Sequence, residues 1–304
     1  MRSIVFPAGG VSFRHAAKRF FFNLQERLTG YKKEKKRFFE KVGYYPDLIN
    51  PRSFSEKMLW KKLYDRNPLL PVTQDKYMVR NYITKVLGSE KAQEILIPLL
   101  FVTDNPGTIP FRDLPGSYIV KPNHGSGWYI VVENNNKTGE EIIDSCRKWL
   151  KTPYGYKKHE WAYQRIKPRV IIEELLRDED GKIPLDFKFF VFHGKCRCLY
   201  VLRHESGNKI ISFFSPDWRY IPVNCGYEQG PSTIERPYNY EEMLSLAESI
   251  GGAFDFVRVD LYSVGKKIYF GELTHYPGSG TYKFEPQSFD FELGRYWKIT
   301  RRMR

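Results

Sequence analysis

Hydrophobic residues recur along this chain first at helical spacing and later in the alternating pattern of strands. Met58, Leu59 and Leu63 lie at the spacing of one helical face. Ser53 or Ser55 can cap this helix, because a serine hydroxyl accepts a hydrogen bond from a free N–H of the first turn. A helix beginning just after these serines is therefore predicted.

A second helix is predicted from Thr73 to Gly88. Tyr77, Tyr82 and Val86 lie along it, and a glycine commonly ends a helix. Two further helices are predicted at residues 139–150 and 240–250. Short apolar or alternating runs predict strands at residues 95–102, 117–121, 129–133, 170–175, 186–192, 198–203 and 210–214.

Two more strands are predicted near the C-terminus. Residues 256–262 alternate, residues 265–267 form a turn, and residues 268–273 return as the second strand of a hairpin. The mixture of helical and strand-rich regions indicates the α+β class.

This hairpin carries the most informative polar residues of the chain. Facing strands bring Asp260 and Glu272 close enough to share hard cations, and Thr274 points to the same side as Glu272. A Pro277–Gly278 turn follows and lets the backbone approach a ligand. Two carboxylates beside such a turn indicate a site for magnesium and a nucleotide.

Composition narrows the class of protein. The chain has 304 residues, of which 41% are hydrophobic and 16% aromatic, so a folded protein with one large domain or several packed lobes is expected. The chain has no run of 18 apolar residues, so no membrane span is predicted. The N-terminal stretch is too short and too broken to be a secretory signal. Four cysteines do not make a disulfide framework, which favours a reduced, cytoplasmic protein.

The net charge of +14 calls for an anionic partner. Between Phe13 and Lys41 there are ten Lys or Arg and three acids, and Phe21, Leu24 and Leu28 lie at helical spacing among them. Two interpretations are open for this basic arm. It could lie on an anionic membrane surface, as on the inner face of the plasma membrane, or its apolar stripe could pack on the body of the protein.

Three internal motifs could contact a nucleotide. Lys121 and the loop Gly125-Ser126-Gly127 follow a strand and offer a cation and free N–H groups to phosphate, although such a loop can also be a plain hairpin. Glu173 and Glu174 end an apolar strand that could border an adenine, or they could be solvated acids. Asp186 and Lys188 share the polar face of a third strand, where a lysine suits a phosphate.

The order of these motifs resembles the ATP-grasp enzymes, and most closely the TupA-like ATP-grasp amidoligases, which are found with genes for bacterial capsule, teichuronopeptide and O-antigen synthesis. The resemblance covers roughly residues 50–294. It is carried by the segments 50–57, 75–80, 121–127, 173–174, 184–189, 258–260 and 272–278.

The resemblance implies specific roles. Arg80 stands where these enzymes usually carry a phosphate-binding lysine, and Lys121 matches their second one. The loop 125–127 would close over the phosphates, the segment from Glu173 to Leu176 would bind adenine, and Asp186 falls near the ribose-binding acid.

The resemblance also implies how catalysis is arranged. Asp260 and Glu272 would bridge two magnesium ions, with Thr274 in place of the usual asparagine ligand. Arg258 and Lys188 are the predicted catalytic residues, since Arg258 would steady the charge of an acyl-phosphate or tetrahedral intermediate.

A ligase follows from these expectations. It would use ATP and Mg²⁺ to join a carboxylate to an amine, and would attach an amino acid to a uronic-acid sugar of a cell-surface polysaccharide or its lipid-linked precursor. The predicted organisation is an arm (1–50), a helical lobe (51–115) and an ATP-grasp domain (116–304) with lobes at 116–175 and 176–304.

Two rivals remain open. One is a phosphotransferase of the same fold that phosphorylates a sugar hydroxyl. The other is a non-catalytic, basic protein that binds a glycan or nucleic acid, although the clustered carboxylates make nucleic acid a poor fit.

Overall fold

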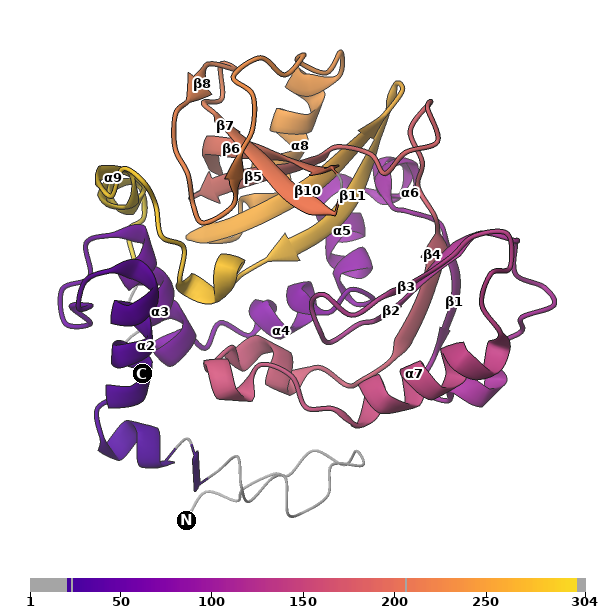
Figure 1. The fold of residues 1–304 in the computed structure, drawn as a ribbon, viewed down its shortest axis with the longest axis horizontal. Helices are drawn as coiled ribbons and strands as arrows, with labels where there is room; N and C mark the ends of the chain where they lie inside the picture. The colour runs from indigo at the N-terminus through magenta and orange to yellow at the C-terminus, as the bar shows by residue number, and fades with distance from the viewer. Residues whose placement is uncertain (1–20, 23, 206, 300–304) are drawn as a thin grey trace.

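Two β-sheets organise the chain, and the helices pack against them (Figure 1). The computed structural model describes residues 21–22, 24–205 and 207–299. In the smaller sheet the strand order is β1-β4-β2-β3, with β1 Leu99–Thr103, β2 Tyr118–Pro122, β3 Ile130–Val132 and β4 Val170–Glu174. In the larger sheet the order is β11-β10-β5-β6-β7-β8, and β9 pairs with β7.

The strands of the larger sheet are β5 Asp186–Phe192, β6 Lys195–Glu205, β7 Asn208–Phe214, β8 Tyr220–Ile221, β9 Glu228–Gln229, β10 Phe256–Val264 and β11 Lys267–Thr274. The helices are α2 Lys32–Val42, α3 Phe54–Tyr64, α4 Leu69–Gln74, α5 Val79–Leu87, α6 Ser89–Ile95, α7 Gly139–Lys151, α8 Tyr240–Gly251 and α9 Ser288–Tyr296. Short 3₁₀ turns lie at Pro106–Thr108, Tyr156–Lys158, Trp161–Arg165 and Pro277–Gly280.

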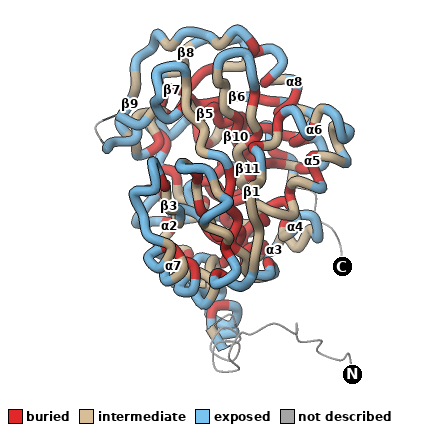
Figure 2. Tube along the Cα trace, turned by 90° about the vertical axis from the view of Figure 1, so that its right-hand side faces the viewer, coloured by how far each residue is buried: buried red, intermediate tan, exposed pale blue. Residues whose placement is uncertain are grey.

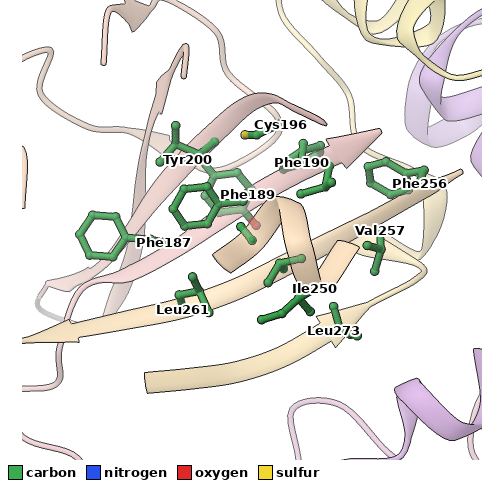
Figure 3. Packing of buried hydrophobic residues seen from close by; sticks show 14 of the residues in the cluster. Phe187, Phe189, Phe190, Cys196, Tyr200, Ile250, Phe256, Val257, Leu261 and Leu273 are labelled. Atoms are coloured by element: carbon green, nitrogen blue, oxygen red, sulfur yellow. The ribbon is translucent and has the colours of Figure 1, made fainter. Parts of the chain in front are cut away.

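The core is built on β5, which is covered on both faces (Figure 3). Phe189 packs beside Tyr240 of α8 on one face, and Phe190 and Phe192 pack against Phe54 of α3 on the other. A strand buried on both sides reads as a nearly continuous apolar run, which explains the sequence of β5. A smaller core lies between α7 and the small sheet, and Figure 2 marks the buried residues of the chain in red.

Most predicted strands and three of the four predicted helices are confirmed to within a few residues. The cap of α3 is also confirmed: the Ser53 hydroxyl accepts from the Glu56 N–H, and the Glu56 carboxylate accepts from the Ser53 N–H. This reciprocal pair satisfies two N–H groups of the first turn and fixes where the helix begins.

The single helix predicted from Thr73 to Gly88 is wrong. The structure has two helices, α4 and α5, with a break between Gln74 and Val79. Asp75 causes the break, because its carboxylate accepts hydrogen bonds from the N–H groups of Tyr77 and Met78. A side chain that bonds to backbone two or three residues ahead starts a new helix and ends the old one.

The strand predicted at residues 95–102 is also wrong at its start. Residue 95 ends α6, and the strand begins only after Pro98, which has no N–H to give to a sheet. This strand, β1, precedes residue 116 yet pairs with β4 in the small sheet. The division of the chain at residues 50, 115 and 175 otherwise stays a prediction.

The described part of the basic arm shows features of both interpretations. In α2, Phe38 and Val42 are buried against Leu59 and Leu63 of α3. In contrast, the helical turns before α2 leave Phe21 66% and Leu28 79% exposed. Phe20 and Lys18 lie outside the described residues. Within the described ranges, no helix is long and apolar enough to cross a membrane.

Candidate active site

The antiparallel pair β10–β11 presents the predicted carboxylates side by side. Asp260 lies opposite Glu272, and Arg258 lies opposite Thr274. The Thr274 hydroxyl donates to Glu272 Oε1 at 3.0 Å and accepts from Arg258 Nη2 at 2.9 Å. The predicted pairing of the two strands is thus confirmed, whereas what these residues bind stays a prediction.

Asp260 is held by two cations. Arg258 donates to both of its oxygens, with Nε at 2.7 Å from Oδ1 and Nη2 at 2.6 Å from Oδ2. Lys188 of the neighbouring strand β5 lies directly opposite in register, and its Nζ is 2.6 Å from Oδ2. Only 1% of Asp260 is exposed, so Arg258 and Lys188 replace the hydration that this carboxylate loses on burial.

Asp186 completes this cluster of charged side chains. Its Oδ2 is 2.5 Å from Lys188 Nζ, while its Oδ1 is buried without a hydrogen-bond partner. Burial, together with the nearby Asp260, outweighs Lys188 and raises the pKa of Asp186 to about 6. The predicted ribose contact therefore stays a prediction, and the geometry places Asp186 beside the carboxylate pair.

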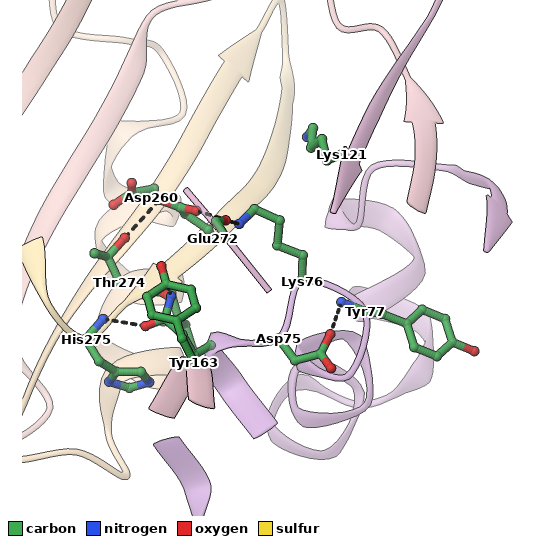
Figure 4. A network of polar contacts seen from close by, with 12 residues as sticks. Asp75, Lys76, Tyr77, Lys121, Tyr163, Asp260, Glu272, Thr274 and His275 are labelled. Carbon is green, nitrogen blue, oxygen red and sulfur yellow. Dashed lines mark hydrogen bonds and ion pairs between the residues drawn. The ribbon is translucent and has the colours of Figure 1, made fainter. Parts of the chain in front are cut away.

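Lys76 links the two sheets and was not assigned a role from the sequence (Figure 4). It lies in the break between α4 and α5, where its Nζ donates to the Gly125 carbonyl at 2.5 Å and lies 3.8 Å from Glu272 Oε2. Burial alone would raise the pKa of Glu272, but Lys76, Lys188 and Arg258 lower it to about 2. The Asp75-Lys76 pair stands in the sequence, but the position of Lys76 beside Glu272 depends on the break between α4 and α5.

Lys121 and Arg80 lie together at a second position, on the small sheet. Both contact Glu173, with Lys121 Nζ at 2.9 Å from Oε2 and Arg80 Nη1 at 3.5 Å from Oε1. Arg80 also donates to the Ile97 carbonyl at 2.9 Å. Glu174 is exposed at the end of β4, and Leu176 is half-buried just beyond it. Arg80 thus helps to neutralise Glu173, whereas Lys76 lies beside Glu272.

The glycine-rich loop is anchored at its base. Asn123 accepts from the Arg169 N–H at 2.7 Å and donates to the Lys167 carbonyl at 3.0 Å. Gly127 has a φ of 76°, a conformation that favours glycine. A side chain at Gly125 would come within 3.0 Å of the Trp128 ring. The loop is therefore shaped by its glycines; whether Ser126 and its neighbours close over phosphate stays a prediction.

Buried hydrogen bonds fix α4 to the end of β11. The Thr73 hydroxyl is 2.7 Å from His275 Nε2, and Gln74 Oε1 accepts from the His275 N–H at 3.2 Å. Burial lowers the pKa of His275 well below its ordinary value, so the ring is neutral. His275 thus connects the end of β11, which carries Thr274, to the end of α4, which precedes Lys76.

Asp260 and Glu272 offer carboxylate oxygens, which are the ligands that Mg²⁺ prefers. In the described part of the chain, no group of three or more His, Cys, Asp and Glu is placed to hold a metal. Mg²⁺ does not need such a cage, since it commonly binds one or two carboxylates and completes its shell with water and substrate phosphate. Asp260 and Glu272 are two hard donors opposite each other in register. The residues therefore fit Mg²⁺ held jointly with a phosphate.

The low pKa of Glu272 predicts a pH-dependent contribution to stability. Because this pKa is about 2 in the folded protein and near 4.5 in the unfolded chain, the contribution is fully present above pH 4.5 and is lost as the pH falls toward 2. We expect the stability difference between wild type and Glu272→Gln, measured by urea unfolding, to shrink across this window. The exposed Glu228→Gln variant is the control, and an unchanged difference would contradict the charge network.

Comparison with solved structures finds similar chains. They include D-alanine–D-alanine ligase from Bacillus anthracis (16% identity, TM-score 0.42, 67% of this chain and 57% of that chain). They also include the enzyme of the same name from Helicobacter pylori (13%, 0.42, 75% and 62%) and N5-carboxyaminoimidazole ribonucleotide synthetase from Thermus thermophilus (14%, 0.41, 72% and 50%). This chain thus spans less than two thirds of each of these proteins.

The comparison with curated proteins gave no match. The family model described as TupA-like ATPgrasp matches residues 56–298, which include both sheets and every predicted site residue. The chain therefore has the ATP-grasp fold and belongs to the TupA-like ATP-grasp family.

Proposed function

We propose that this protein is an ATP-dependent ligase that joins a carboxylate to an amine through an acyl phosphate. The observation that carries the proposal is the meeting of Asp260 and Glu272 with Lys76, Lys188 and Arg258. These cations now neutralise the carboxylates. When a triphosphate binds, a lysine can turn to phosphate oxygens while the carboxylates accept a divalent ion, so the charge of the site stays balanced.

The residues of the chain divide the work by position. Lys76 and Lys121 can reach a triphosphate from the α4–α5 break and from β2, and the Gly125–Gly127 loop offers its N–H groups to the same phosphates. Glu173 to Leu176 would border the adenine, with Arg80 holding Glu173 in place. Mg²⁺, held by Asp260 and Glu272, would neutralise phosphate oxygens; one or two such ions are consistent with these ligands.

The proposed reaction then proceeds in two nucleophilic substitution steps. An oxygen of the substrate carboxylate attacks the γ-phosphorus, the bond to the β-phosphate oxygen breaks, and ADP leaves. The amine next attacks the acyl carbon, the amide bond forms with loss of an amine proton, and inorganic phosphate leaves with the bonding electrons and takes up that proton. Arg258 is placed to stabilise the negative charge of the tetrahedral species, because burial and Asp260 fix its guanidinium beside the carboxylate pair.

The positive charge of the protein supports an acidic acceptor substrate. We propose that the carboxylate belongs to a uronic-acid sugar of a cell-surface polysaccharide or its lipid-linked precursor and that the amine is an amino acid. The net charge of +14 favours such a substrate, as does the exposed, basic arm with Phe21 and Leu28, which suits peripheral contact with an anionic membrane. A basic tail, predicted to meet the same acidic partner, comprises Arg295, Lys298, Arg301, Arg302 and Arg304, of which the last three lie outside the described residues.

An ADP-release screen tests the proposed function. Amino acids are crossed with uronic-acid sugars in the presence of MgATP, and mass spectrometry identifies the product. We expect one new amide and one inorganic phosphate for each ADP released. A phosphorylated sugar without free phosphate would indicate a phosphotransferase. Failure to bind MgATP, together with salt-sensitive binding of RNA, would indicate a non-catalytic binding protein.

A further inference from the structure

A cationic pocket lies between α3 and α9, away from the site described above. Its volume is about 360 Å³, which is within the range of small-molecule sites. Among the residues that line it there is no Asp or Glu, and the polar and aromatic ones are Asn50, Arg52, Lys57, Trp60, Arg295, Trp297 and Lys298. A pocket with several cations and no acid attracts an anion.

Helix α3 separates this pocket from the turn that follows Thr274. The Ser55 hydroxyl donates to the Tyr282 carbonyl and Lys62 Nζ donates to the Ser279 carbonyl, so one face of α3 looks toward that turn. Lys57 and Trp60 stand on the other side of the same helix, since residues follow each other by about 100°. A helix is about 10 Å across with its side chains. The pocket is therefore a second site and not an extension of the first.

The floor of the pocket is rigid and its rim is charged. Lys57 Nζ donates to the carbonyls of Gly294 and Trp297, at 2.8 and 2.6 Å, which closes the C-terminal end of α9. Trp297 is 1% exposed, so it forms the base of the pocket. Arg52, Arg295 and Lys298 are exposed at the rim, and within the described residues none of them forms an ion pair.

We infer that this pocket binds an anionic saccharide unit, that is, a sugar ring that carries a carboxylate or a phosphate. A guanidinium matches either group through two parallel hydrogen bonds, and two are available at the rim, from Arg52 and Arg295. The half-buried Trp60 offers a flat apolar surface on which the C–H face of a ring can pack. A lipid surface fits less well, because it contacts side chains that protrude and this site is concave.

The pocket also has a use in the proposed reaction, and this use depends on the proposed function. If the acceptor is a chain of acidic sugars, one unit could occupy the pocket while another lies near Glu272. Holding a second unit raises the effective concentration of the reacting one without a new contact at the centre. A single sugar would gain nothing from the pocket.

Binding to the full chain without ATP tests the inference, so its outcome is independent of catalysis. Trigalacturonate is titrated while tryptophan fluorescence and heat are recorded, and maltotriose, inorganic pyrophosphate and phosphatidylglycerol vesicles are compared. We expect trigalacturonate to bind and the double variant Arg295→Gln/Lys298→Gln to weaken it at least about tenfold, since two charge-assisted hydrogen bonds are lost. Binding of pyrophosphate without trigalacturonate would overturn the saccharide assignment, because the proposed triphosphate site also offers cations to pyrophosphate.

The control is Lys266→Gln/Lys267→Gln, which removes the same charge from the exposed β10–β11 turn. It should leave trigalacturonate binding unchanged, and both double variants should bind MgATP as the wild type does. An equal loss in both variants would mean non-specific attraction and overturn the inference. Equal binding of maltotriose, or a defect confined to vesicles, would overturn it as well. Trp60→Leu should abolish the fluorescence change if the ring packs on Trp60.

Discussion

Replacing Glu272 by glutamine is expected to lower the rate of ADP release about a thousandfold or more, with little change in fold. The substitution keeps the shape of the side chain and removes the charge that Lys76 and Arg258 now face at 3.8 and 3.6 Å. Charge stabilisation by a metal is worth several kcal/mol, and about 1.4 kcal/mol corresponds to tenfold in rate. Asp260→Asn should have a similar or larger effect, because it also leaves Arg258 and Lys188 without their shared carboxylate.

Calorimetry separates a metal role from a general loss of activity. Wild type should bind ATP more tightly when MgCl₂ is present, and Glu272→Gln should lose most of that gain while still binding ATP without metal. The matched control is Glu228→Gln, an exposed change on β9 of the same sheet, which should retain the gain. Full Mg²⁺ dependence in Glu272→Gln, together with normal ADP release, would remove Glu272 from the proposed site.

Local pattern was enough to predict the β10–β11 hairpin. Alternating residues on both sides of Gly265 define two strands, and the turn between them sets which residues face each other. Asp260 and Glu272 could therefore be paired from sequence, even though a bulge after Asp260 shifts the later register. Gly271 is the extra residue of this bulge, and a side chain there would come within 2.9 Å of the Tyr262 ring.

Features that depend on distant partners could not be predicted in this way. Helical spacing continues through the α4–α5 break, and only the hydrogen bonds of the Asp75 carboxylate interrupt it. Lys76 therefore lies inside the predicted helix, and its position beside Glu272 could not be predicted. The Glu173 carboxylate that contacts Arg80 is likewise 93 positions along the chain, and the phosphate role of Arg80 stays a prediction. The pocket beside α9 was missed for the same reason, since its cations come from both ends of the sequence.

Removing Glu34 alone is expected to destabilise the protein by about 3–5 kcal/mol, because it leaves the buried ammonium of Lys62 without its counter-charge. Glu34 Oε1 is 2.7 Å from Lys62 Nζ, and their side chains are 6% and 0% exposed. Burial already lowers the pKa of Lys62 despite Glu34. Lys62 also donates to the Ser279 carbonyl at 2.9 Å, so the arm helix α2 supports the turn after Thr274.

Urea unfolding of Glu34→Leu and of the double variant Glu34→Leu/Lys62→Met tests this dependence. The double variant should recover most of the lost stability, since two apolar side chains replace the buried pair and Arg37, which also contacts Glu34, is partly exposed to water. The control on the same helix is Glu40→Leu, which breaks an exposed contact with Lys36 at 3.8 Å and should change stability by less than about 1 kcal/mol. If Glu34→Leu lowers the free energy of unfolding no more than Glu40→Leu does, the Glu34–Lys62 pair does not stabilise the packing of α2 on the rest of the protein. If the double variant is as unstable as the single one, the packing of α2, and not the charge of Lys62, explains the loss.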